Sequence, residues 1–385
     1  MLRFIGKRAV QMVALFIIYL SVLYILLHAQ PGDISAQLVS NPNLPPEARE
    51  MVRARLGLDK PLWLQYLNYI KNFFTGNLGV SFSQYPRPVT KIILERLPRT
   101  IVLFLSATLV AYSIGFYLGK ILAWKRGKAS EYAVTVGGVM LYTVFYPWFG
   151  LMMIWLFAFI FGLFPVGKFI DPQEWFGSGF SVNRVFQLMM LTTLAASVVM
   201  FGITWASNRL RERRRRIILR RAGFAAVLVV FLGYWWTSPM RPFAGDILHH
   251  LILPVMTLAL VVFGGVMLIM RSSMLETLRE DYILTARAKG LPDSVVRDRH
   301  AARNALLPVV TSLVLALAFV IGGGIITEAV FSWPGMGEVL LNAALVEDIP
   351  LAIGALAFIG VLALVGHLVA DILYTFLDPR IRYQG

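Results

Sequence analysis

Long apolar runs separated by short basic segments occupy most of this chain. A helix needs about 20 apolar residues to cross a bilayer, and eight runs are of roughly that length or more. None shows the alternation of apolar and polar positions that a barrel strand requires. The runs cover residues 9–27, 101–124, 132–164, 185–206, 217–236, 248–270, 308–331 and 350–376. The pattern predicts an all-α membrane protein with about eight transmembrane helices.

The third run is long for a single crossing and contains Tyr146-Pro147-Trp148 near its middle. Two crossings would not fit there and would make the number of spans odd, so we expect one kinked or tilted helix. Such a break at membrane depth can line a transport path. An ordinary proline kink packed inside a bundle is the alternative.

Basic residues predict the orientation of these spans. Arg3, Lys7 and Arg8 precede the first run, and other basic segments follow the second run, join the fourth to the fifth and join the sixth to the seventh. An even number of spans places all these segments and both termini on one side, and basic loops mark the cytoplasmic side. The first run also resembles a signal peptide. Because it is longer than the usual apolar core and no cleavage site follows, we expect a retained span.

The composition fits this interpretation. Of the 385 residues 15% are charged, whereas soluble domains carry about a quarter, so we expect lipid to contact much of the surface. The net charge of +15 raises the question of nucleic acid, but membrane loops explain the clustering of arginines beside apolar runs. We therefore expect no nucleic-acid partner.

Residues suited to catalysis or cofactor binding are sparse. The chain has no cysteine, which excludes disulfides and cysteine-ligated metals. The GxxxxGK[ST], HExxH and GxSxG motifs are absent, and the five histidines are scattered. Lys120 is expected to extend toward the cytoplasmic interface, while Glu328 and Asp371 are expected to reach water or a helix terminus rather than to form a proton pathway. Gly322-Gly323-Gly324 is expected to allow close helix packing.

Two polar regions lie outside the spans. Residues 30–100 form a long external region, whose aromatic residues predict short helices near the outer interface. The internal loop of residues 271–307 contains a short helix with small residues at Ala286 and Ala288, which Gly290 ends. Such a helix, parallel to the membrane, suits docking into a groove of a soluble partner. A solvated basic loop is the alternative.

This internal loop resembles that of ABC-importer permeases in the dipeptide/oligopeptide/nickel family, B-type subunit. The matching positions are Asp281-Tyr282, Ala286-Arg287-Ala288-Lys289-Gly290, His300, Arg303-Asn304-Ala305 and Pro308. Further family-like segments follow one another in order at residues 56–61, 76–79, 95–98, 331–337, 371–374 and 377–380. Together they extend the resemblance over most of the chain.

Two features depart from the general pattern. Thr285 stands where the generic importer motif has glutamate, which agrees with the peptide-type branch. The resemblance implies a six-helix type I core, so residues 171–241 are expected to be an added helical hairpin with an arginine-rich cytoplasmic loop. As a hypothesis, Arg213 to Arg216 bind anionic lipid head groups.

The resemblance divides the chain into residues 1–100 with the first span and the external region, 101–170 with core spans two and three, the hairpin 171–241, and 242–385 with the remaining core spans and the coupling loop. It implies a permease subunit without its own nucleotide site, catalytic residue, metal or cofactor. The partners it implies are a homologous second permease, two ATPase subunits that bind ATP and Mg²⁺, and an external substrate-binding protein. Peptides are the leading substrate, with nickel chelates, oligosaccharides and glutathione-like molecules left open.

The resemblance also implies roles for the loop residues. Those expected to couple the permease to the ATPase are Ala286, Arg287, Ala288, Lys289, Gly290 and Leu291. Those expected to brace the loop are Asp281, Tyr282, His300, Arg303 and Asn304. Two other classes stay open: a secondary transporter or channel acting alone, and an intramembrane enzyme. The first would need an ion site within the spans and the second a catalytic pair, and neither is evident in the sequence.

Overall fold

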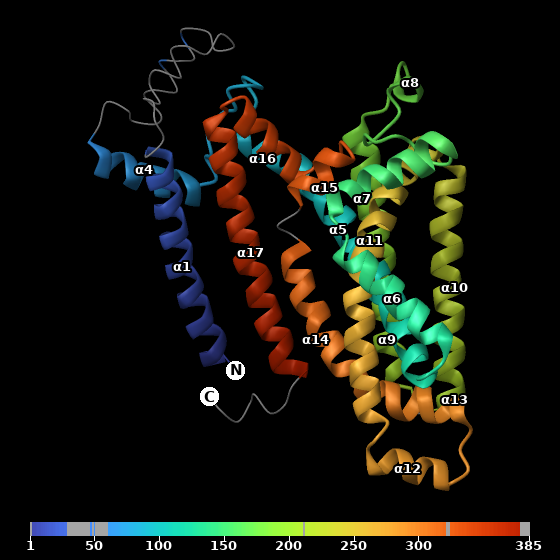
Figure 1. Ribbon diagram of the computed structural model, residues 1–385. Helices are drawn as coiled ribbons and strands as arrows, with labels where there is room; N and C mark the ends of the chain where they lie inside the picture. The colour runs from blue at the N-terminus through green and yellow to red at the C-terminus, as the bar shows by residue number, and fades with distance from the viewer. Residues whose placement is uncertain are drawn as a thin grey trace. The chain divides into compact units, whose positions relative to one another are not determined.

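The computed structural model describes residues 2–28, 61–210, 212–320 and 324–377, together with residues 47 and 50 (Figure 1). Within this part of the chain the regular elements are helices, and an isolated bridge joins Val80 to Pro88. The all-α class predicted from the sequence is therefore confirmed. The chain divides into two compact units, one made of residues 1–156 and 254–385 and the other of residues 157–253, and each is described by itself.

The larger unit contains most of the helices. They are α1 (Leu2–His28), α4 (Leu62–Phe74), α5 (Val89–Trp124), α6 (Ala129–Thr143), α7 (Tyr146–Met153), the last part of α11 (Arg241–Thr277), α12 (Asp281–Ala288), α13 (Asp293–Val295), the π-helix η2 (Val296–Ala301), α14 (Ala302–Val320), α15 (Ile325–Val330), α16 (Met336–Leu345) and α17 (Ile349–Leu377). The π-helix η1 (Ile154–Ile160) continues α7.

Hydrophobicity and length make six helical segments candidate membrane spans in the described part of the chain. They are α5, α9, α10, α11, the segment of residues 293–317 and the segment of residues 349–370 in α17. The bent pair of α6 with α7 and η1 brings the number to seven. The first predicted run forms α1, in which residues 10–26 make a shorter apolar helix. The number of eight spans stays a prediction.

The third run is broken rather than gently kinked. α6 and the following helical segment meet at 106°, and the residues between them, Val144 and Phe145, have extended backbone. Pro147 stands at the start of α7, where its missing N–H costs no hydrogen bond because the first turn of a helix has no intrahelical acceptors for its N–H groups. The single kinked or tilted helix expected here is thus not what forms, because two separate helical segments meet at a sharp break.

The boundaries predicted for the seventh run were wrong. α14 begins at Ala302 and continues from η2, so Pro308 lies inside it rather than at its start. Beyond Val320 the chain does not continue as one helix, because Gly324 has extended backbone and α15 is a separate short helix. Glycine weakens helices, which explains why the helix ends near the glycine triplet. Gly322 and Gly323 lie outside the described residues.

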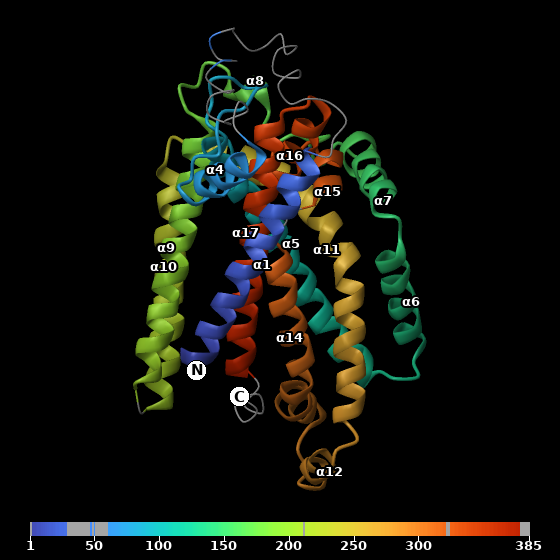
Figure 2. The same cartoon turned by 90° about the vertical axis from the view of Figure 1, so that its left-hand side faces the viewer.

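Close contacts between helices hold the larger unit together. α14 packs against α5 and α17, and α1 packs against α17 (Figures 1 and 2). Glycines allow α5 and α11 to approach closely: a Cβ at Gly115 would lie 2.7 Å from the Cβ of Val266, and one at Gly119 would lie 2.6 Å from the carbonyl oxygen of Met267. Small residues at helix interfaces commonly serve this purpose in membrane proteins.

The external region is described only in part. α4 is the aromatic helix expected there, and it packs against α1, where the Tyr66 hydroxyl lies 2.6 Å from that of Ser21. The segment of residues 56–61 falls almost wholly outside the described residues. The motif at residues 377–380, apart from Leu377, and the side chain of Asp371 also lie outside the described residues.

The smaller unit contains α8 (Pro172–Trp175), the pair α9 (Val182–Asn208) and α10 (Arg213–Thr237), and the first part of α11. α9 and α10 run side by side as a hairpin, and Arg220 of α10 donates to the side chain of Asn208 at 2.9 Å. Asp246 is buried and accepts hydrogen bonds from the Trp175 indole and from the Asp171 backbone. Its other carboxylate oxygen pairs with His250 at 3.0 Å. No residue of α10 is buried.

Candidate functional site

The helix α12 lies beyond the ends of α11 and α14, at one end of the larger unit (Figures 1 and 2). Asp281 stands in its first turn, where a negative charge is favourable for the helix dipole. Gly290 follows the helix with φ of +71°, and its N–H donates to the Arg287 carbonyl. Glycine adopts this left-handed conformation without the steric cost of a side chain. The predicted helix and its glycine stop are therefore both present.

One face of α12 packs on the rest of the loop. Ile283 and Ala286, three residues apart and hence on one side of the helix, are buried in a cluster with residues from α5, α11, η2 and α14. The members of this cluster include Ala123, Met270, Met274, Val296, Ala301, Ala302 and Ala305. Leu291 is partly buried against the same cluster. The loop is thus a packed subdomain whose core includes the end of α5.

The predicted surface of small residues needs a correction. Ala286 points into the apolar cluster and does not lie on the exposed face, because the helix turns it to the same side as Ile283. The exposed predicted coupling residues are Arg287, Ala288, Lys289 and Gly290, and Leu284 with 59% of its surface exposed lies beside them. The free face is therefore basic with an apolar leucine, and Leu284 was missed by the sequence reasoning.

Two of the five predicted bracing residues meet. The amide nitrogen of Asn304 donates to the Tyr282 hydroxyl at 2.8 Å, which joins α14 to α12. His300 is half-buried, whereas Asp281 and Arg303 are exposed. The structure thus brings Tyr282 and Asn304 together.

An ion pair links this loop to α5 and was not predicted. The ammonium of Lys120 lies 3.1 Å from a carboxylate oxygen of Asp298 in η2, and Arg297 pairs with the same carboxylate at 2.8 Å. Lys120 was expected only to reach the interface. The pairing could not be read from the sequence, because the two residues are far apart along the chain and both positions look like ordinary polar flanks.

A second unpredicted ion pair joins α6 to α11. Glu131 is buried, with 2% of its surface exposed, and its carboxylate accepts from the Arg271 guanidinium and from the Gly127 N–H at 2.8 Å. A buried carboxylate that loses its partner is costly. The pair therefore fixes the turn after α5 to the start of the internal loop.

Glu328 does not reach water. Its carboxylate is fully buried and accepts from the Thr100 hydroxyl at 2.7 Å and from the backbone N–H groups of Gly337 and Glu338 at 2.6 and 3.0 Å. These two N–H groups belong to the first turn of α16, so the prediction that Glu328 reaches a helix terminus is confirmed. A Cβ at Gly335 would collide with this carboxylate, which explains a glycine in the segment of residues 331–337.

No group of three or more His, Asp or Glu side chains in the described part of the chain is placed to hold a metal ion. The site consists of the exposed face of α12, its apolar support and two ion pairs that connect it to the long helices. An arrangement of this kind is suited to transmitting movement between a bound partner and the helices.

Comparison with known proteins decides the family. A family model described as "Binding-protein-dependent transport system inner membrane component" matches residues 199–383, and its N-terminal counterpart matches residues 1–104. The oligopeptide transport system permease protein AppB of Bacillus subtilis is 30% identical over 360 residues, which cover 94% of this chain and 93% of the relative. The chain belongs to this family of ABC-importer permeases.

Alignments with two other relatives extend over the whole length of the permease. The di/tripeptide transport system permease protein DppB of Pseudomonas aeruginosa is 31% identical over 384 residues, and the dipeptide transport system permease protein DppB of Escherichia coli is 32% identical over 384 residues. Each alignment covers 100% of both proteins. The family recognised from the loop motifs is thus confirmed, and the permease is a multi-pass protein of the cytoplasmic membrane that works within an ABC transporter.

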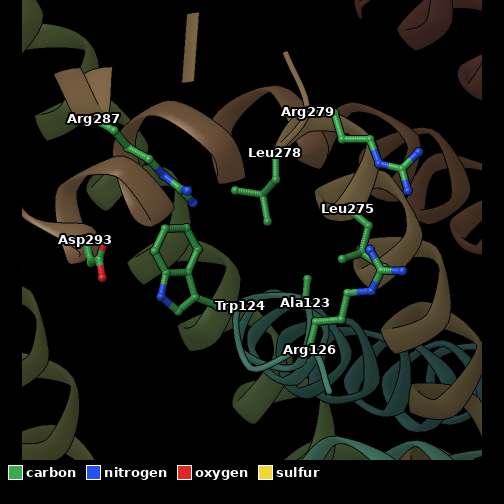
Figure 3. A pocket seen from close by; sticks show the side chains of 8 residues that line it. All are labelled: Ala123, Trp124, Arg126, Leu275, Leu278, Arg279, Arg287 and Asp293. Carbon is green, nitrogen blue, oxygen red and sulfur yellow. The ribbon is translucent and has the colours of Figure 1, made fainter. Parts of the chain in front are cut away.

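A pocket of about 430 Å³ lies next to α12 of the permease (Figure 3). It is formed by the end of α5 and the residues after it, the end of α11, and residues of α12 and α13. The guanidinium of Arg287 lies over the Trp124 ring, 5.5 Å from its centroid, which is within the range of cation–π attraction. The helix α12 is therefore linked to α5 on this side too.

Proposed function

We propose that this chain is the transmembrane subunit of an importer for dipeptides or oligopeptides, and that α12 couples it to a cytoplasmic ATPase. The observation that carries the proposal is the exposed face of α12, formed by Leu284, Arg287, Ala288, Lys289 and Gly290, on a helix whose opposite face is locked to the spans. The peptide substrate is supported by the printed functions of the relatives. The proposed complex contains a homologous second permease, two ATPases that bind ATP and Mg²⁺, and an external substrate-binding protein.

The proposed topology has eight spans with both termini in the cytoplasm, and residues 171–241 form an added hairpin. The positive-inside distribution supports it. The chain has no cysteine, so single-cysteine variants can be labelled with an impermeant maleimide in intact cells. We expect Gly76→Cys and Gly177→Cys to be labelled from outside, and Arg214→Cys and Ala288→Cys only after the membrane is opened. Labelling of Ala288→Cys in intact cells would reject this orientation.

In the proposed mechanism the basic face of α12 pairs with carboxylates on the ATPase. ATP binding favours one position of α12, and the loop moves as one body because Ile283 and Ala286 are packed into its core. The ion pairs Lys120–Asp298 and Arg271–Glu131 then transmit the displacement to α5, α6 and α11. The permease contributes no nucleotide site of its own.

The test is Gly290→Asp. Apart from its chain neighbours, no atom of the described residues lies within 4 Å of the position that its Cβ would take, so the internal cost is limited to placing a side chain at φ of +71°, about 1 kcal/mol. The added carboxylate would, however, stand on a basic surface meant for carboxylates of the partner. We expect normal membrane levels, loss of the ATPase on purification in mild detergent, and loss of ATP-driven peptide uptake.

Gly177→Asp is the matched control. Gly177 has φ of +73° and equally open space around it, but it lies in the other compact unit. Normal uptake by Gly290→Asp, or equal losses in both variants, would contradict the coupling role. Transport by the permease alone in liposomes would instead favour a secondary transporter.

A further inference from the structure

The pocket beside α12 has an unusual combination of charge and apolar surface. Its wall contains three arginines and a single carboxylate, set against an indole ring and leucine side chains (Figure 3). The volume of about 430 Å³ is within the range of small-molecule sites. The residues that matter for the argument are Trp124, Arg126, Leu278, Arg279, Arg287 and Asp293.

The arginines are available to an anion. Arg126 and Arg279 form no ion pair or side-chain hydrogen bond with the described residues, although the charge of Arg126 also acts on the Glu131 carboxylate. Arg287 contacts the Trp124 ring rather than a carboxylate. Guanidinium groups bind phosphate through paired N–H donors. Three of them around one pocket, with Asp293 as the one carboxylate of its wall, therefore favour a phosphate-bearing ligand.

The position of the pocket favours the phosphate of a lipid head group over free inorganic phosphate. It lies where the apolar run of α5 ends at Trp124 and about two helical turns beyond the apolar run of residues 248–270 in α11. Tryptophan with basic residues just beyond an apolar run is typical of the head-group layer. Ala123, Leu275 and Leu278 supply an apolar part, which a lipid fills with its glycerol and first methylene groups. Inorganic phosphate or a carboxylate side chain would leave that part uncovered.

We propose that this pocket binds the head group of an anionic phospholipid, with Arg126 and Arg279 holding the phosphate and Trp124 packing against the lipid. The inference rests on the proposed function only for the cytoplasmic orientation of the pocket. A bound head group would also attract Arg287 and so hold α12 against α5 and α11. Anionic lipid therefore stabilises the loop in the position from which α12 meets its partner.

The experiment uses the assembled importer in nanodiscs, with binding of fluorescent phosphatidylglycerol as the readout. An arginine near the lipid surface contributes about a fivefold change in affinity, so Arg126→Gln with Arg279→Gln is expected to weaken binding about 25-fold. The control is Lys125→Gln with Lys128→Gln, which removes the same charge from the same segment without touching the pocket wall. It is expected to weaken binding much less.

Three outcomes would overturn the proposal. The first is equal weakening in the two double variants, which would mean general surface attraction. The second is full competition by millimolar inorganic phosphate, which would mean a free-anion site. The third is loss of the ATPase from the arginine variant with unchanged lipid binding, which would mean that the pocket receives a carboxylate of the partner. Peptide uptake by the unmodified importer is measured separately, so failure of the proposed transport function is distinguishable from failure of the lipid site.

Discussion

Replacement of the buried Glu328 tests how the segment of residues 331–337 is held. In Glu328→Ala the Thr100 hydroxyl and the N–H groups of Gly337 and Glu338 lose their acceptor while remaining buried. An unsatisfied buried donor costs about 1–3 kcal/mol, so three of them sum to about 3–9 kcal/mol. Relaxation and entry of water reduce this, and we expect the free energy of unfolding to fall by about 3–5 kcal/mol.

Glu328→Gln is the informative comparison. Its amide oxygen can still accept from the two N–H groups of α16, and its NH₂ group can donate to the Thr100 hydroxyl, which itself accepts from the Met336 N–H at 2.8 Å. The free energy of unfolding then falls because the charge is lost and the Thr100 hydroxyl proton loses its acceptor, by about 1–3 kcal/mol. SDS titration of the purified protein in mixed micelles measures both values. Glu276→Ala, at an exposed position in α11, is the surface control and is expected to change stability by less than about 0.5 kcal/mol.

A double-mutant cycle tests directly whether Thr100 and Glu328 stabilise the protein through their mutual hydrogen bond. Thr100→Val removes the hydroxyl that links Glu328 to α16, so its effect should shrink in the Glu328→Ala background. We expect a coupling energy of about 1–3 kcal/mol between the two sites. Additive effects, or a Glu328→Ala variant no less stable than Glu328→Gln, would refute the view that this carboxylate holds the start of α16.

Two further predictions concern the ion pairs of the internal loop. Arg271→Gln leaves the Glu131 carboxylate without its guanidinium partner, so the free energy of unfolding is expected to fall, whereas the Glu131→Gln/Arg271→Gln double variant should recover part of the loss. Lys120→Asp should reduce ATP-driven uptake several-fold at unchanged membrane level, because like charges then face each other between α5 and η2. The reciprocal Asp298→Lys change should restore at least half of the uptake, and absence of restoration would mean that the pair has no role in coupling.

The sequence predicted the features that depend on local pattern. The long apolar runs form helices, as expected for segments long enough to cross a bilayer. The end of α12 could be predicted because glycine commonly follows the end of a helix, as Gly290 does here. The end of α14 was misjudged for a related reason. Apolar character continues through the glycine triplet into α15, so hydrophobicity alone could not show that the helix stops there.

The features that depend on distant contacts could not be predicted. Ala286 points inward because Ala123 and Val296 build an apolar cluster on that side, and an eight-residue helix is too short for its own pattern to reveal the buried face. The pairing of Lys120 with Asp298 likewise depends on how α5 and η2 lie in space. Charged residues at span ends are common, and nothing in the local pattern separates a paired one from a solvated one.

The break between α6 and α7 has a consequence for how this chain can exist in a membrane. α6 has 15 residues, and α7 with η1 has 8 and 7, so each arm is about 22 Å long at 1.5 Å per residue. A hydrocarbon layer is about 30 Å thick, which neither arm spans alone. If the pair crosses the membrane, the extended backbone at Val144 and Phe145 lies at a depth where lipid offers no hydrogen bonds. Another part of the protein or a water-filled cavity must then lie beside it.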